Sequence, residues 1–228
     1  MINFNKTNLF FLAMITASCT AVSAAELEIQ FTDGAEMNAP ISGSARFNGS
    51  GACELNGSVT DDVTLMAGNT KVSSAAPFGS DKVIFLDDGT GHSRSLEAMA
   101  PMDLPNLQMN SSGKVIADAA VNLKQVSGNY KLTLAGVGVF TPIVDSSSST
   151  NDTDIVGAGG LSVASLSNKL PTGIVTVYES SSMRIAPGLA FGPTDVVAEN
   201  KLVFKNNSKC ILGNNASLDR YITVGSQS

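Results

Sequence analysis

Apolar residues recur at every second position in short runs along this chain. Leu27, Ile29 and Phe31 alternate with polar neighbours, and a longer run of the same kind extends from Val115 to Leu123. A period of two places successive side chains on opposite faces of an extended strand. Similar or short apolar runs occur at residues 63–66, 82–86, 130–134, 161–166, 173–178, 201–204 and 221–224. Because no segment shows a helical period over about ten or more residues, the pattern predicts an all-β protein.

Turn-forming residues separate these runs. Examples are Asp87-Asp88-Gly89 and Pro187-Gly188, and Ser127-Gly128-Asn129 lies between the runs that end at Leu123 and begin at Tyr130. The last turn predicts a hairpin. Short strands joined by loops rich in Gly, Ser, Asn and Asp are typical of an antiparallel sandwich, which we expect here rather than a barrel. The polar segment 146–154 has no apolar anchor and predicts an exposed loop.

The first 24 residues predict a secretory signal peptide. Lys6 is the only charge before an apolar run that starts at Leu9, and Val22-Ser23-Ala24 resembles a cleavage site. That run is too short to cross a bilayer, and no later segment approaches the roughly 20 apolar residues of a membrane helix. We therefore expect an exported protein without a membrane span. A competing interpretation makes Cys19 the lipidated first residue of a bacterial lipoprotein, although Thr16 stands where such signals usually have a bulky aliphatic residue.

The length and composition of the chain limit its domain organisation and the classes of partner it can bind. The chain has 228 residues, of which 43% are hydrophobic and 15% charged, which suits one folded core. We expect residues 25–33 to be an amino-terminal extension or first strand and residues 34–228 to form a single β-sandwich domain. The net charge of −6 leaves no basic surface for a nucleic acid. One His and three Cys offer little for imidazole or zinc chemistry, so we expect neither enzymatic activity nor a cofactor or metal.

The single histidine lies in a turn. His92 follows Asp87 and Asp88 across a Gly-Thr-Gly stretch, which brings a metal site or a catalytic triad into consideration. One His beside two turn carboxylates is more often part of a solvated loop, and we expect that role here.

Two cysteines, Cys53 and Cys210, remain once the leader is removed. An even pair in an exported chain most simply forms a disulfide. Such a bridge would join the first and last parts of one domain. The alternatives are two buried free thiols, or a thiol used between subunits.

One stretch of the sequence resembles a known class of surface proteins. The segment from Arg46 to Cys53 contains Phe47-Asn48-Gly49, and Val63-Thr64-Leu65 follows it. This resembles the opening of fimbrial subunits of the chaperone-usher class, where a Phe-x-Gly strand leads to a Cys and then to a Val-x-Leu strand. The segment from Phe47 to Thr60, with its two Asn-Gly-Ser units, is also similar to the opening of the subfamily of fimbriae whose subunits are themselves adhesive. The chain departs from the family in the late position of Cys210 and in the lack of a penultimate Tyr.

The resemblance implies a fold and a mode of assembly. Family members are immunoglobulin-like antiparallel β-sandwiches that lack one strand, which the amino-terminal extension of a neighbouring subunit supplies. Leu27, Ile29 and Phe31 occupy the place of such a donor strand. Strand addition would provide main-chain hydrogen bonds, and pockets for alternate side chains would set the register. The other interpretation is that these residues form the first strand of the chain's own sandwich.

We therefore predict a structural or adhesive subunit of a bacterial surface fimbria, polymerised by donor-strand complementation. The expected partners are neighbouring fimbrial subunits, a periplasmic chaperone and an outer-membrane usher, with a host receptor glycan as a further candidate. The protein would pass through the periplasm to the fimbrium at the cell surface. The alternative function is a secreted or periplasmic β-sandwich module that binds a carbohydrate or protein ligand.

Overall fold

The computed structural model describes residues 26–73, 78–79, 82–165, 167–191, 202–218 and 222–224. The expected leader and Cys19 lie outside the described residues. All secondary-structure elements in these ranges are β-strands. The strands are β1 (Leu27–Phe31), β2 (Ala35–Met37), β3 (Ala45–Leu55), β4 (Val63–Val72), β5 (Lys82–Phe85), β6 (Arg94–Ala98), β7 (Met102–Asp103), β8 (Asn106–Met109), β9 (Gly113–Ala117), β10 (Val121–Leu123), β11 (Val126–Gly128), β12 (Leu132–Gly136), β13 (Val139–Pro142), β14 (Thr153–Val156), β15 (Gly160–Val163), β16 (Val175–Val177), β17 (Ser182–Ile185), β18 (Ala190–Phe191), β19 (Leu202–Phe204), β20 (Lys209–Leu212), β21 (Ser217–Leu218) and β22 (Ile222–Val224).

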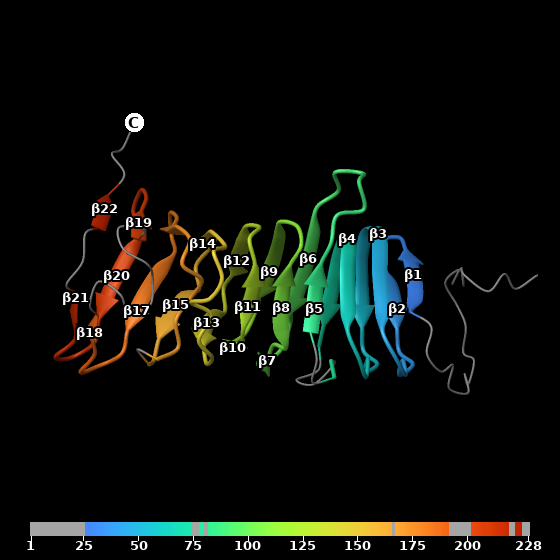
Figure 1. Cartoon of the computed structure of the whole chain (residues 1–228), viewed down its shortest axis with the longest axis horizontal. Coiled ribbons are helices and arrows are strands. Elements are labelled where there is room, and N and C mark those ends of the chain that lie inside the picture. The colour runs from blue at the N-terminus through green and yellow to red at the C-terminus, as the bar shows by residue number, and fades with distance from the viewer. Residues whose placement is uncertain are drawn as a thin grey trace, which may run out of the picture.

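The strands build a β-solenoid of about 8 turns. All strand pairs of the described residues are parallel and join successive turns, and the strands at the edges of a sheet, such as β1, β7, β11 and β20, have a partner on one side only. Figure 1 shows them as a row that crosses the long axis of the molecule, from β1 at one end to β20 and β22 at the other. The expected immunoglobulin-like antiparallel sandwich is therefore wrong. The chain coils along one axis instead of folding two sheets face to face.

Three walls enclose the interior. The first wall contains β1, the beginnings of β3 and β4, and then β5, β8 and β11. The second wall contains β2, the ends of β3 and β4, and then β6, β9, β12, β14, β16, β19 and β22. The third wall contains β7, β10, β13, β15, β17 and β20. Because β3 and β4 are long, each passes from the first wall into the second.

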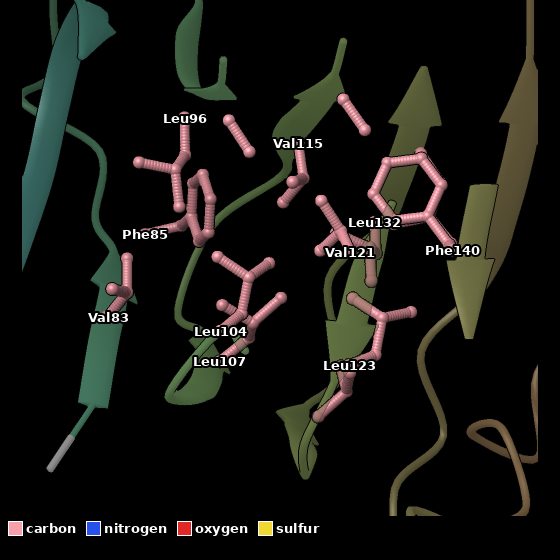
Figure 2. Close-up of a cluster of buried hydrophobic side chains, with 14 of the residues drawn as sticks. Val83, Phe85, Leu96, Leu104, Leu107, Val115, Val121, Leu123, Leu132 and Phe140 are labelled. Atoms are coloured by element: carbon pink, nitrogen blue, oxygen red, sulfur yellow. The ribbon is translucent and has the colours of Figure 1, made fainter. Parts of the chain in front are cut away.

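The core consists of columns of apolar side chains that run along the axis. Partners in adjacent turns take the same inward position, so an apolar residue stacks on the apolar residue of the turn before. One column on the second wall contains Leu96, Val115, Leu134, Ile155, Val177 and Phe204, all of them buried. Figure 2 shows side chains of all three walls pointing into the shared interior, among them Phe85, Val115 and Phe140. A single turn cannot bury its inward face alone, so each turn depends on its neighbours for stability.

The expected hairpin between residues 115–123 and 130–134 is also wrong. The run at 115–123 is split by a corner into β9 and β10, which lie on different walls. β9 and β12 are indeed neighbours, but they are parallel, with Val115 opposite Leu134. Between them the chain passes through β10 and β11 on the other two walls. Alternation with a period of two fixes which side chains point inward, and it does not fix strand direction.

Glycines make the tight corner between the second and third walls. Gly136 has a φ of 107°, and a Cβ atom there would lie 2.2 Å from the carbonyl oxygen of Ala117 in the turn before. At Gly157, with a φ of 98°, a Cβ would lie 2.6 Å from the carbonyl oxygen of Gly136. Successive turns therefore stack closely at this corner because neither residue has a side chain.

The segment 146–154, expected to be an exposed loop, has buried and exposed residues along its length and directs several polar side chains into the solenoid. Ser146, Ser149 and Asn151 are buried, and β14 begins at Thr153. The Ser146 hydroxyl accepts a hydrogen bond of 2.8 Å from the amide of Val126, and the Asn151 side-chain amide donates to the carbonyl of Tyr130 at 2.6 Å. The side chains of Ser146 and Asn151 are tolerated in the interior because they satisfy backbone groups of the preceding turn.

Candidate functional site

The first turn forms the amino-terminal end of the described solenoid. Leu27, Ile29 and Phe31 point inward from β1, where they align with Ala45, Phe47 and Gly49 of β3. Ile29 and Phe31 are buried and Leu27 is half-buried. The three residues of the expected donor strand thus belong to the first turn of the chain's own solenoid. Donation of this strand to a neighbouring subunit stays a prediction.

Part of the core is incompletely covered at this end. Ala35 and Met37 of β2 are half-buried, although they align with the buried Cys53 and Leu55 of the next turn. Among the described residues, no strand pairs with the far edge of β1 or β2. The amide of Leu27 donates to the carbonyl of Ser44 at 2.9 Å. Since backbone groups alternate in direction along a strand, those of Glu28 and Gln30 face the open edge.

β20 forms the last turn of the third wall at the opposite end. Its residues continue the inward columns of that wall, with Cys210 opposite Met183 and Leu212 opposite Ile185. Met183 and Ile185 are 0% and 2% exposed, whereas Leu212 is 45% exposed and Cys210 is also exposed. The positions are equivalent, and the difference is that no further described strand covers β20. Within the described residues, the core of the third wall is therefore uncovered at this end.

The free edge of β20 also has backbone amide and carbonyl groups that point away from its neighbour β17. The amide of Lys209 donates to the carbonyl of Ser181 at 3.0 Å, and that of Gly213 donates to the carbonyl of Ile185 at 2.8 Å. By the same alternation, the backbone groups of Cys210 and Leu212 face away from β17. An edge strand with unpaired backbone groups and exposed apolar side chains is a template for pairing with another chain.

The two ends carry opposite charge. Residues 26–44 contain Glu26, Glu28, Asp33 and Glu36 and no basic residue. Glu26 forms an ion pair with Arg46 at 2.6 Å, and the other three acids form no ion pair within the described part of the chain. Residues 202–218 contain Lys205 and Lys209 and no acidic residue.

The lysines at the carboxyl-terminal end have few partners in the described part of the chain. Neither Lys205 nor Lys209 forms an ion pair there. Lys205 lies over the ring of Tyr178, 5.1 Å from its centroid. Both lysines are exposed, so their charge is available to a partner at this end.

The expected bridge between Cys53 and Cys210 is not formed, and both thiols are free. Cys53 lies in β3 on the second wall near the amino-terminal end, and Cys210 lies in β20 on the third wall at the other end. A disulfide requires Cα atoms within about 7 Å of each other, which the length of the solenoid prevents. Burial, reinforced by the charge of Glu54, raises the pKa of the Cys53 thiol to about 11. Partial burial also raises the pKa of the Cys210 thiol.

A loop between β5 and β6 contains the turn with the single histidine. It rises above the row of strands in Figure 1. The Asp88 carboxylate accepts hydrogen bonds from the Thr90 hydroxyl at 2.6 Å and the Thr90 amide at 2.9 Å, and these bonds lower the pKa of Asp88. Asp87 forms an ion pair of 3.2 Å with Arg94. The two carboxylates thus hold the loop in shape, and His92 is exposed to solvent.

Neither a metal site nor a membrane helix is found where the structure is described. No group of three or more His, Cys, Asp or Glu side chains is close enough there to hold a metal ion. The same residues include no helix with the length and hydropathy of a membrane span.

No protein-family model, no curated protein and no solved structure matches this chain. The functional conclusion therefore depends on the geometry of the solenoid and its two ends. Sequence reasoning placed the amino-terminal strand at residues 27–31 and missed β20. The signal for β20 was present, because Cys210-Ile211-Leu212 is an apolar run between two Asn-rich turns.

Proposed function

We propose that this protein is a structural or adhesive subunit of a bacterial surface assembly, in which neighbouring subunits bind at the ends of the solenoid. The observation that carries the proposal is the open end at β20, where Leu212 occupies a core position and is 45% exposed. Solenoids usually close their terminal turns with a polar outer face. An end that leaves apolar core residues and a strand edge uncovered favours a partner.

The rest of the molecule supports a structural role. A rod of stacked turns has long side walls in which the turns repeat at a constant spacing. Such walls suit a spacer or an extended adhesive surface. The expected signal peptide provides the route of export. Chaperone and usher remain the proposed assembly partners, while the incomplete sandwich has no place in the proposal because the fold is a solenoid.

Surface location and assembly state test this function together. Antibodies raised against the purified protein should label intact cells by immunogold electron microscopy. Protein released from the cell surface by shearing should migrate as multimers in unheated samples and as single chains after boiling. Deleting neighbouring genes for a chaperone or usher, where they exist, should abolish the labelling. A monomer confined to the periplasm or the medium would contradict the proposal and favour the exported binding module.

A further inference from the structure

We infer that the partner at the carboxyl-terminal end is the amino-terminal end of a second copy of this chain, so that copies stack head to tail along the solenoid axis. This inference rests on the proposed function and names the partner of the same site. A head-to-tail contact uses two different surfaces and leaves one of each free, so it builds an open filament.

The direction of the strands permits this stacking. Every strand pair found among the described residues is parallel, and β1 and β20 lie at opposite ends of one axis. A second copy placed in the same orientation continues the parallel stack without reversing any strand. The free backbone groups of Glu28 and Gln30 on the first wall then face the same joint as those of Cys210 and Leu212 on the third wall. β1 and β20 lie on different walls, so the segment of the second copy that would lie opposite β20 is the one around Ile41, which follows β2.

Both ends of the solenoid expose apolar side chains that head-to-tail stacking would bury. Leu27, Ala35 and Met37 are half-buried at one end, and the inward positions of β20 at the other end hold Cys210, which is exposed, and Leu212, which is 45% exposed. Stacking one end on the other would cover both sets of side chains. Within the chain, every turn between the two ends is covered in this way by its neighbours.

Charge selects head-to-tail stacking over contacts between identical ends. Glu28, Asp33 and Glu36 give the first turn a negative surface, and Lys205 and Lys209 give the last described turn a positive one. Two amino-terminal ends, or two carboxyl-terminal ends, would place like charges together, which disfavours those contacts. Opposite ends attract within the Debye length of about 8 Å at physiological salt.

Charge reversal provides the first test. Mature protein, residues 25–228, is purified from the exported fraction, and its assembly is followed by sedimentation and negative-stain electron microscopy across a range of concentrations. The unmodified protein should form filaments one solenoid wide. The double variant Lys205→Glu/Lys209→Glu should remain monomeric at concentrations at least tenfold higher. Lys209→Glu alone, which leaves the contact between Lys205 and Tyr178 intact, should have a smaller effect in the same direction.

A matched control separates a local effect of the end from a general effect of net charge. Lys114 is exposed in β9, on the side of the rod. Lys114→Glu changes the net charge by the same amount as Lys209→Glu and should leave filament formation unchanged. Circular dichroism of each variant should match that of the unmodified protein. If Lys114→Glu reduces assembly as much as Lys209→Glu, the charged ends do not direct the stacking.

Complementary variants provide the sharpest test. Glu28→Lys/Glu36→Lys changes the charge of the three acidic positions that form no ion pair within the described residues at this end from −3 to +1, and this variant alone should also fail to assemble. Mixed with Lys205→Glu/Lys209→Glu, it should restore filaments, because every joint between the two variants again pairs opposite charges. The two chains, labelled with different fluorophores, should alternate along the filament. A mixture that stays monomeric would overturn the inference.

The strand edge is tested with proline. Leu212→Pro removes an amide that faces away from β17, so the pairing within the chain should survive. The variant should remain folded and should not form filaments. If it polymerises like the unmodified protein, strand pairing at β20 is excluded.

Surface labelling distinguishes failure of the stacking from failure of the proposed surface role. If cells are labelled but the purified protein stays monomeric, only the stacking is contradicted. If filaments form but cells are not labelled, only the surface role is contradicted.

Discussion

Burial gives the Cys53 thiol a pKa of about 11, against an ordinary value of 9.0. A thiol whose pKa is raised by folding stabilises the folded state below its unfolded pKa, and that contribution is lost as the pH rises towards the folded pKa. We therefore expect the free energy of unfolding to fall between pH 9 and pH 11, by about 2 to 3 kcal/mol from this thiol. Urea unfolding of the unmodified protein and of Cys53→Ala at several pH values measures the difference. A pH dependence identical in both proteins would contradict it.

Gly136 and Gly89 both have a positive φ, of 107° and 78°, but their surroundings differ. A Cβ at Gly136 would overlap the backbone of Ala117, whereas nothing lies within 4 Å of a Cβ at Gly89. Gly89→Ala should cost only the backbone strain, about 1 to 2 kcal/mol. Gly136→Ala should cost about 1 to 3 kcal/mol more, because two stacked turns must separate. Thermal unfolding of the two variants measures the gap, and equal losses would show that the corner is not closely packed.

At the scale of the element, the buried segment after β13 depends on hydroxyl groups rather than apolar ones. Ser146→Ala leaves the amide of Val126 without its partner, and a buried unsatisfied donor costs about 1 to 3 kcal/mol. Ser148 lies two residues away and is exposed, so Ser148→Ala should change stability by less than about 0.5 kcal/mol. Chemical unfolding of the pair provides the measurement. The prediction fails if the two substitutions have the same effect.

The alternating runs located about half of the 22 described strands, and the predicted arrangement of the strands was wrong. Expected runs at 63–66, 82–86 and 161–166 coincide with β4, β5 and β15, because alternation reports burial on one face. Parallel sheets are usually buried on both faces and lack alternation. A solenoid wall has one inner and one outer face, so its parallel strands show the pattern of an antiparallel sheet.

The repeat was hidden by its variable length. Leu27 aligns with Ala45, 18 residues later, whereas Val175 aligns with Leu202, 27 residues later. Corners and loops of different lengths absorb the difference, so no fixed period marks the turns. The variable length of the turns also explains why only one end of the candidate site was predicted from the sequence. The position of β1 followed from alternation, but the exposure of Leu212 depends on which strands lie beside β20, and that depends on the coiling.

On the scale of the whole molecule, the solenoid should open from its ends. Each turn is stabilised by the turn on either side, and the terminal turns have only one described neighbour. We expect amide hydrogen exchange to be slowest in β9 and β12 and fastest in β1 and β20. Exchange measured by mass spectrometry on peptic fragments would show the gradient. Raising the protein concentration should slow exchange at both ends if the ends are joined, and uniform exchange along the chain would contradict the expectation.

The loop between β5 and β6 offers a use for a rod that assembles through its ends. It projects from the side of the solenoid, away from both ends (Figure 1), and its shape comes from hydrogen bonds of Asp87 and Asp88 within the loop. Loop tips of this kind accept inserted sequence at little cost. A peptide inserted between Gly91 and His92, which leaves the bonds of Asp87 to Gly89 and of Asp88 to Thr90 in place, would therefore be displayed once per subunit, at regular intervals along a filament, without touching the surfaces that join the copies.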